Sequence, residues 1–97
     1  MRELIAPSID YLLQEIVIAE TASEGEIEKF PRKRVYDILH RWAGLKRISE
    51  RQGVGEEGLY ELIDEKASHY HLSRSWRETI QNVILRIRSE RIARAAS

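Results

Sequence analysis

The stretch FPRKRVYDILHRWAGLKRISE, from Phe30 to Glu50, decides the expected fold. It predicts one amphipathic helix, because apolar residues recur at i, i+3, i+4 and i+7 and share one face. These residues are Val35, Ile38, Leu39 and Trp42. Pro31 suits the first helical turn, where its missing N–H costs nothing, and Gly44 suits the left-handed position that ends a helix. We therefore expect this helix to begin near Pro31 and to end near Gly44.

Two short strands are expected after the helix, joined by the glycine-rich segment GVGEEG. The partly alternating residues are Ile48, Glu50 and Gln52 in the first strand and Leu59, Glu61 and Ile63 in the second. A helix, a strand, a glycine-rich loop and a strand form the second half of a winged helix-turn-helix domain. The predicted fold class is therefore mostly α with a small β-hairpin. The alternative is a generic α+β hairpin without nucleic-acid function.

The residues before the basic helix fit the same plan. Ser8 is a good N-cap for a first helix that runs to about Glu20. Ser23 and Glu26 have the spacing of a capping box and are expected to open a second, short helix. With the basic helix as the third, these elements place a winged helix-turn-helix domain in residues 1–66.

The basic helix also resembles a known type of DNA-reading helix. The motif K-R-V-Y-D-I-L from Lys33 to Leu39, followed by Trp42 and by G-L-x-x-I-S-E, is similar to the reading helix of winged-helix transcription factors. The closest wording occurs in eukaryotic cell-cycle factors that bind promoters through an R-R-x-Y-D motif. Prokaryotic winged-helix regulators, including archaeal sugar-responsive ones, carry similar phrasing. The resemblance covers the basic helix closely and the rest of residues 1–66 loosely.

This resemblance implies a role for four residues. Lys33 and Arg34 take the place of the paired arginines that touch guanine edges, and Tyr36 and Asp37 take the place of the Tyr-Asp that follows. Lys33 departs from the arginine of the cell-cycle factors, and lysine lacks the two-pronged donor geometry of arginine. Identical base specificity is therefore not expected.

Charge is segregated along the chain although the net charge is zero. Residues 32–52 carry seven basic and two acidic groups, whereas residues 53–67 carry one basic and five acidic groups. A local positive patch attracts phosphate even where the total charge is balanced. The expected DNA-binding residues are Arg32, Lys33, Arg34, Tyr36, Asp37, His40, Arg41, Lys46, Arg47 and Arg51. The alternative is an ordinary balanced surface, and Glu56 and Glu57 at the expected wing tip would oppose phosphate.

The C-terminal third, residues 67–97, reads as a separate helix for packing or dimerisation. Ser75 and Glu78 have capping-box spacing, and the helix is expected to reach about Ala96. The stripe assigned to dimerisation consists of Trp76, Ile80, Val83, Ile84 and Ile87. Leu85 and Ile92 lie off this stripe, so the helix needs more than one partner surface. We expect one side to pack within the chain and another to meet a second copy, which makes the protein a homodimer; a purely intrachain helix is the alternative.

Other chemistry is weakly indicated. The chain contains no cysteine, and His69 and His71 stand two residues apart without an obvious third metal ligand. The glycines of GVGEEG have dinucleotide-loop spacing, but two glutamates inside the loop would repel phosphate. We therefore expect no metal, cofactor, small-molecule ligand or enzymatic activity, and no membrane segment or leader in what reads as a cytoplasmic protein.

These features predict a dimeric, sequence-specific regulator of transcription that binds double-stranded DNA. The alternative is a winged-helix adaptor that binds proteins, or an assembly subunit of a DNA-handling complex. The basic helix favours the regulator, and the acidic segment that follows it favours the adaptor.

Overall fold

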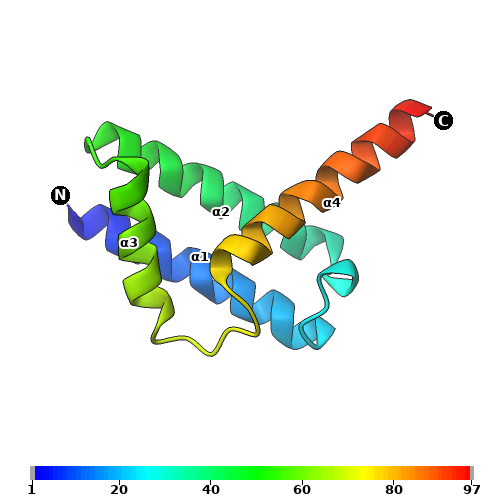
Figure 1. Ribbon diagram of the computed structural model, residues 1–97, viewed down its shortest axis with the longest axis horizontal. Coiled ribbons are helices and arrows are strands. Elements are labelled where there is room, and N and C mark those ends of the chain that lie inside the picture. The colour runs from blue at the N-terminus through cyan, green and yellow to red at the C-terminus, as the bar shows by residue number, and fades with distance from the viewer. Residues whose placement is uncertain (1, 97) are drawn as a thin grey trace.

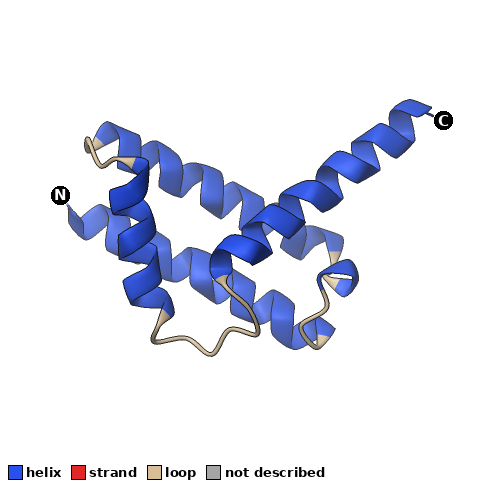
Figure 2. Ribbon diagram, in the orientation of Figure 1, coloured by secondary structure: helices blue, strands red, loops and turns tan. Residues whose placement is uncertain are grey.

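A computed structural model describes the backbone of residues 2–96 and the side chains of residues 5–96. Its elements in chain order are α1 (Arg2–Ser23), the short 3₁₀ helix η1 (Ile27–Lys29), α2 (Arg32–Arg51), α3 (Glu56–Ala67) and α4 (Trp76–Ala96) (Figure 1). The described residues include no β-strand (Figure 2). The predicted winged helix-turn-helix with its β-hairpin is therefore wrong, and the fold is all-helical.

The helices pack around one core. α1 and α2 lie side by side and antiparallel, α3 packs across one end of this pair, and α4 crosses the pair near its other end (Figure 1). The buried apolar residues are Ile5, Ile9, Leu12, Leu13, Ile16, Ala19, Ile27, Phe30, Val35, Ile38, Trp42, Leu45, Leu59, Ile63, Trp76, Ile80, Val83 and Ile87. All four helices contribute to this cluster, so α4 helps to close the core.

α2 does not end at Gly44, as the sequence had suggested. Leu45 and Ser49 are buried and continue the three-then-four spacing of the apolar face through Trp42, so the helix remains anchored beyond the glycine. The helix ends at Arg51, where Gly53 takes the left-handed conformation (φ +70°). The N–H of Val54 donates to the carbonyl of Ser49, which completes a Schellman motif. The terminating glycine is therefore Gly53.

The expected second wing strand is helix α3. Leu59 and Ile63 stand four residues apart, a spacing that fits one face of a strand and one face of a helix equally well. Both are buried, and the helical phase is settled by Leu62, which also packs against the core. Glu56 and Glu57 occupy the first turn of α3, where the helix dipole stabilises negative charge. The supposed acidic wing tip is thus a helix start.

Two N-terminal boundary predictions are also wrong. Ser8 lies inside α1, which already includes Arg2, because Ile5 and Ile9 extend its buried face toward the N-terminus. Ser23 does not open the second helix: it is the last residue of α1, and its hydroxyl donates to the carbonyl of Ala19 at 2.7 Å. A short helix does follow, as η1.

α4 confirms the predicted C-terminal helix. The hydroxyl of Ser75 accepts a hydrogen bond from the N–H of Arg77 at 3.3 Å, as an N-cap does. The structure buries Trp76, together with Ile80, Val83 and Ile87, in the chain's own core, and Ile84 packs against that core. The stripe assigned to dimerisation therefore faces inward. The C-terminal part of α4 projects from the body (Figure 1).

Candidate nucleic-acid interface

All ten predicted DNA-binding residues lie on α2, but they do not share one face. Because α2 packs against α1 on one side and against α3 and α4 on the other, its exposed arc is narrower than that of a helix buried along a single stripe. The structure divides the ten residues into an outward row and two flanks that contact neighbouring helices.

The outward row consists of Lys33, His40, Arg47 and Arg51, which are all exposed. They recur at intervals of seven, seven and four residues, so they follow one line along the helix. Lys33 and Arg51 are about 27 Å apart along the axis at 1.5 Å per residue. Among the described residues these four side chains make no ion pair and no hydrogen bond. The positive charges of Lys33, Arg47 and Arg51 are therefore available to an external anion.

Arg34, the expected reader of guanine, turns toward α1. Its Nη1 atom lies 3.7 Å from Oε2 of Glu15 and 4.0 Å from Oδ2 of Asp37. Oε2 of Glu15 is buried and accepts no hydrogen bond, so the guanidinium of Arg34 is its compensating charge. The structure therefore gives Arg34 and Asp37 an intramolecular role at the α1–α2 seam.

Arg41 and Lys46 also lean against neighbouring aromatic rings. The guanidinium of Arg41 lies 5.0 Å from the ring centre of Tyr11 in α1. The ammonium of Lys46 lies 5.7 Å from the ring centre of Trp42. Both side chains remain exposed, but each points along a flank of α2. Neither joins the outward row.

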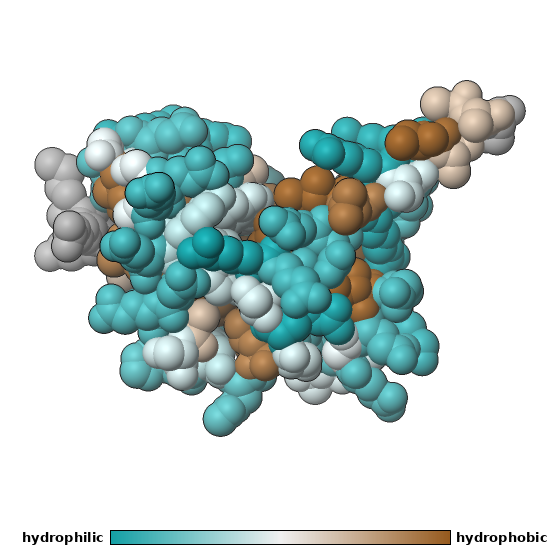
Figure 3. All heavy atoms as spheres, viewed as in Figure 1, coloured by the Kyte–Doolittle hydropathy of each residue, from teal (hydrophilic) through white to brown (hydrophobic). Residues whose placement is uncertain are grey.

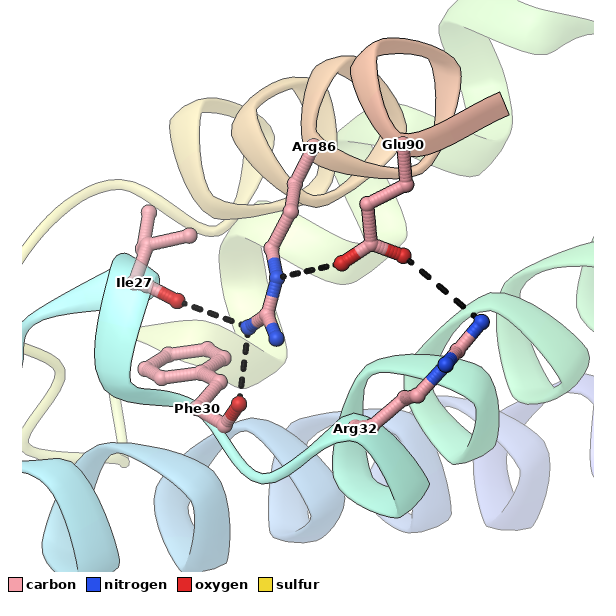
Figure 4. A network of polar contacts seen from close by, with 5 residues as sticks. All are labelled: Ile27, Phe30, Arg32, Arg86 and Glu90. Carbon is pink, nitrogen blue, oxygen red and sulfur yellow. Dashed lines mark hydrogen bonds and ion pairs between the residues drawn. The ribbon is translucent and has the colours of Figure 1, made fainter. Parts of the chain in front are cut away.

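Arg32 belongs to a network that holds the first turn of α2 to α4 (Figure 4). Nη1 of Arg86 donates to the carbonyl oxygens of Ile27 at 3.1 Å and Phe30 at 2.7 Å, which fixes the turn before α2. Nε of Arg86 donates to Glu90 at 3.4 Å, and the other carboxylate oxygen of Glu90 lies 4.0 Å from Nη2 of Arg32. Arg32 also lies 5.8 Å from the ring centre of Tyr36, which is 43% exposed beside the outward row.

An aromatic cluster that the sequence did not indicate lies on the opposite flank of α2. The rings of Trp42, Tyr60 and Trp76 lie 5.5 to 6.1 Å apart, centre to centre. The guanidinium of Arg77 covers the ring of Tyr60 at 4.8 Å and pairs with Asp64 at 2.9 Å. A hydrogen bond to Glu56 raises the pKa of the Tyr60 hydroxyl. A groove of about 310 Å³ borders the cluster, but its cations are already engaged with the rings and with Asp64.

Comparison with models of known protein families, with curated proteins and with solved structures found no match. Over the described residues, no helix combines the length and the apolar character needed to cross a bilayer. No group of three or more His, Asp or Glu side chains in that part of the chain is arranged to hold a metal ion. We therefore infer the function from the geometry of α2.

Proposed function

We propose that this chain is a DNA-binding regulator rather than an enzyme, and that it meets duplex DNA with the outward row of α2. The observation that carries the proposal is the line of Lys33, His40, Arg47 and Arg51, exposed and unpaired among the described residues. Positive side chains that are not neutralised within the protein release counterions when they reach phosphate, and this release drives binding.

The dimensions of α2 fit this role. The major groove of B-DNA is about 12 Å wide and admits one α-helix. α2 offers a continuous exposed edge from its first turn to its last, and Tyr36 and His40 stand between the basic ends of the row. Lys33, Arg47 and Arg51 would contact phosphates, and Tyr36 and His40 would face base edges. Base selection then rests on the middle of α2, without Arg34.

The acidic residues support one orientation on DNA. Glu57, Glu61 and Glu65 are exposed on α3, which is a different element from the outward row. We place the duplex on the outward row rather than on α3, where these glutamates would repel phosphate.

A second candidate function is that of an adaptor or assembly subunit that binds protein. The projecting part of α4 favours it, because Leu85 is 56% exposed and Ile92 is 69% exposed there. An adaptor needs no free positive row on α2, so DNA binding separates the two functions.

The test measures binding to random-sequence duplex DNA by fluorescence anisotropy across a salt series. If Lys33, Arg47 and Arg51 each neutralise one phosphate, affinity should fall about 40-fold between about 50 and 200 mM salt. Arg47→Gln with Arg51→Gln should flatten the slope of log affinity against log salt by about two. The matched control is Lys29→Gln with Lys66→Gln, which removes the same charge outside α2 and should keep the wild-type slope. Equal slopes for both double variants, or no binding at low salt, would exclude the proposal.

A further inference from the structure

The projecting end of α4 carries an apolar edge that no other described residue covers. Leu85 and Ile92 stand seven residues apart on the side of α4 opposite its buried stripe, about 10 Å apart along the axis. Figure 3 shows apolar surface along α4 where it leaves the body. From Arg88 to Ala96 every residue except Glu90 is exposed. A helix end without tertiary packing is weakly stable in water, so this segment gains from a partner.

Positive charge flanks this edge. Arg88 and Arg91 are exposed, and neither forms an ion pair or hydrogen bond with another described residue. We call Leu85, Arg88, Arg91 and Ile92 the α4 ridge. Two parallel copies of this ridge would bring arginines together, so a complementary partner should be acidic beside an apolar groove.

The chain carries such a surface on α3. Glu57, Glu61 and Glu65 are exposed at four-residue intervals, and their carboxylates find no partner among the described side chains. Like charges at this spacing repel one another on a helix, so positive groups of a partner would reduce this repulsion. Glu65 also lines a groove of about 280 Å³ between α1 and α3. Leu62 is its half-buried apolar wall, and Ile5 and Ile9 form a floor that is almost fully buried. His69 and Lys66, which pairs with Asp10 at 3.5 Å, complete the lining. We call these three glutamates and the groove the α3 face.

We propose that the α4 ridge of one copy docks on the α3 face of a second copy, with Leu85 and Ile92 against the apolar groove and Arg88 and Arg91 against the glutamates. The two surfaces cannot meet within one chain, because α3 and the end of α4 lie at opposite ends of a molecule 46 Å long (Figure 1). Two copies with antiparallel long axes make the contact twice, which gives a closed twofold dimer.

This assembly is independent of the proposed DNA binding. The docking surfaces lie on α1, α3 and α4, so the outward row of α2 takes no part in them. Failure of the dimer would leave the DNA proposal untouched, and failure of DNA binding would leave the dimer untouched.

Charge reversal tests the contact. One variant carries Glu57→Lys with Glu61→Lys, and the other carries Arg88→Glu with Arg91→Glu; all four positions are exposed, and circular dichroism checks that both variants keep their helices. Sedimentation equilibrium at micromolar concentration should show a wild-type dimer that weakens with salt. Each variant alone should dissociate at least roughly a hundredfold more readily, because like charges then face each other at both contacts.

An equimolar mixture of the two variants should restore a dimer, since opposite charges then meet at both contacts. The control is Lys33→Glu with Arg51→Glu on the outward row of α2, which should leave the wild-type dimer intact. A monomeric wild type, a reversed variant that remains dimeric, or a mixture that remains monomeric would each overturn the proposal.

Discussion

Replacement of Gly44 by alanine should stabilise the protein, and the sign of this effect separates a continuous α2 from a helix that ends at the glycine. Gly44 lies inside α2, and a methyl group built on its Cα meets no atom within 4 Å outside its own helix backbone. Alanine is favoured over glycine in a helix interior by about 0.8–1 kcal/mol. With no clash to offset this term, Gly44→Ala should raise the free energy of unfolding by about 1 kcal/mol. For a domain of this size that corresponds to a rise in melting temperature of about 4–8 °C.

The matched control is Gly53→Ala. Gly53 is also free of neighbours within 4 Å, but its φ is +70°. Alanine in that left-handed conformation should lower stability by roughly 1–2 kcal/mol. Urea unfolding monitored by circular dichroism at 222 nm measures both effects, because the helical signal is lost when the chain unfolds. If Gly44→Ala destabilised the protein as Gly53→Ala does, α2 would end at Gly44 and the continuous helix would be refuted.

Three further changes test the contacts around α2. Arg34→Ala should lower the free energy of unfolding by about 1 kcal/mol, because buried Oε2 of Glu15 loses its compensating charge. The salt dependence of DNA binding should not change. A flatter slope of log affinity against log salt would show that Arg34 contacts DNA after all. Arg86→Met should lower the free energy of unfolding in urea by about 2–3 kcal/mol, because the carbonyls of Ile27 and Phe30 lose a charged donor. A loss below about 0.5 kcal/mol would show that water replaces the guanidinium as the donor. In an ultraviolet titration, Glu56→Gln should lower the raised pKa of Tyr60. Because the folded pKa of Tyr60 is raised, its contribution to stability is present below its ordinary value near 10 and is lost as pH rises through the folded pKa.

Apolar periodicity predicted the helices where it was long and continuous. The stripe from Val35 to Trp42 packs in the core as expected, and Ser75 caps α4. The stripe of α4 lies on one helix face as predicted, but it is buried in the chain's own core and not in a dimer contact. The predicted fold class was wrong because Gly44, a single glycine, was interpreted as the end of the helix. The spacing of Leu45 and Ser49, which continues the same buried face, held the better signal.

The α3 segment could not be assigned from alternation alone. Leu59 and Ile63 satisfy both the period of a strand and the period of a helix. Only Leu62, together with acidic residues placed at a helix start, distinguishes the two.

The candidate site was predicted at the level of the element and only in part at the level of the residue. The basic character of α2 is a property of the sequence, and Lys33, His40, Arg47 and Arg51 do lie on its exposed side. The position of α1 beside Arg34 depends on tertiary packing, which the sequence of α2 does not contain. Partners such as Glu15 for Arg34 and Tyr11 for Arg41 therefore appeared only in the structure.

The most direct test of the proposed function is a titration of the protein with a short DNA duplex, monitored by amide correlation spectra in nuclear magnetic resonance. Shift changes should concentrate on the exposed side of α2, at Lys33, Tyr36, His40, Arg47 and Arg51, and should diminish as salt is raised. The amides of α3 should change little. Changes confined to the end of α4, or no changes at low salt, would contradict the assignment of α2 as the DNA-binding surface.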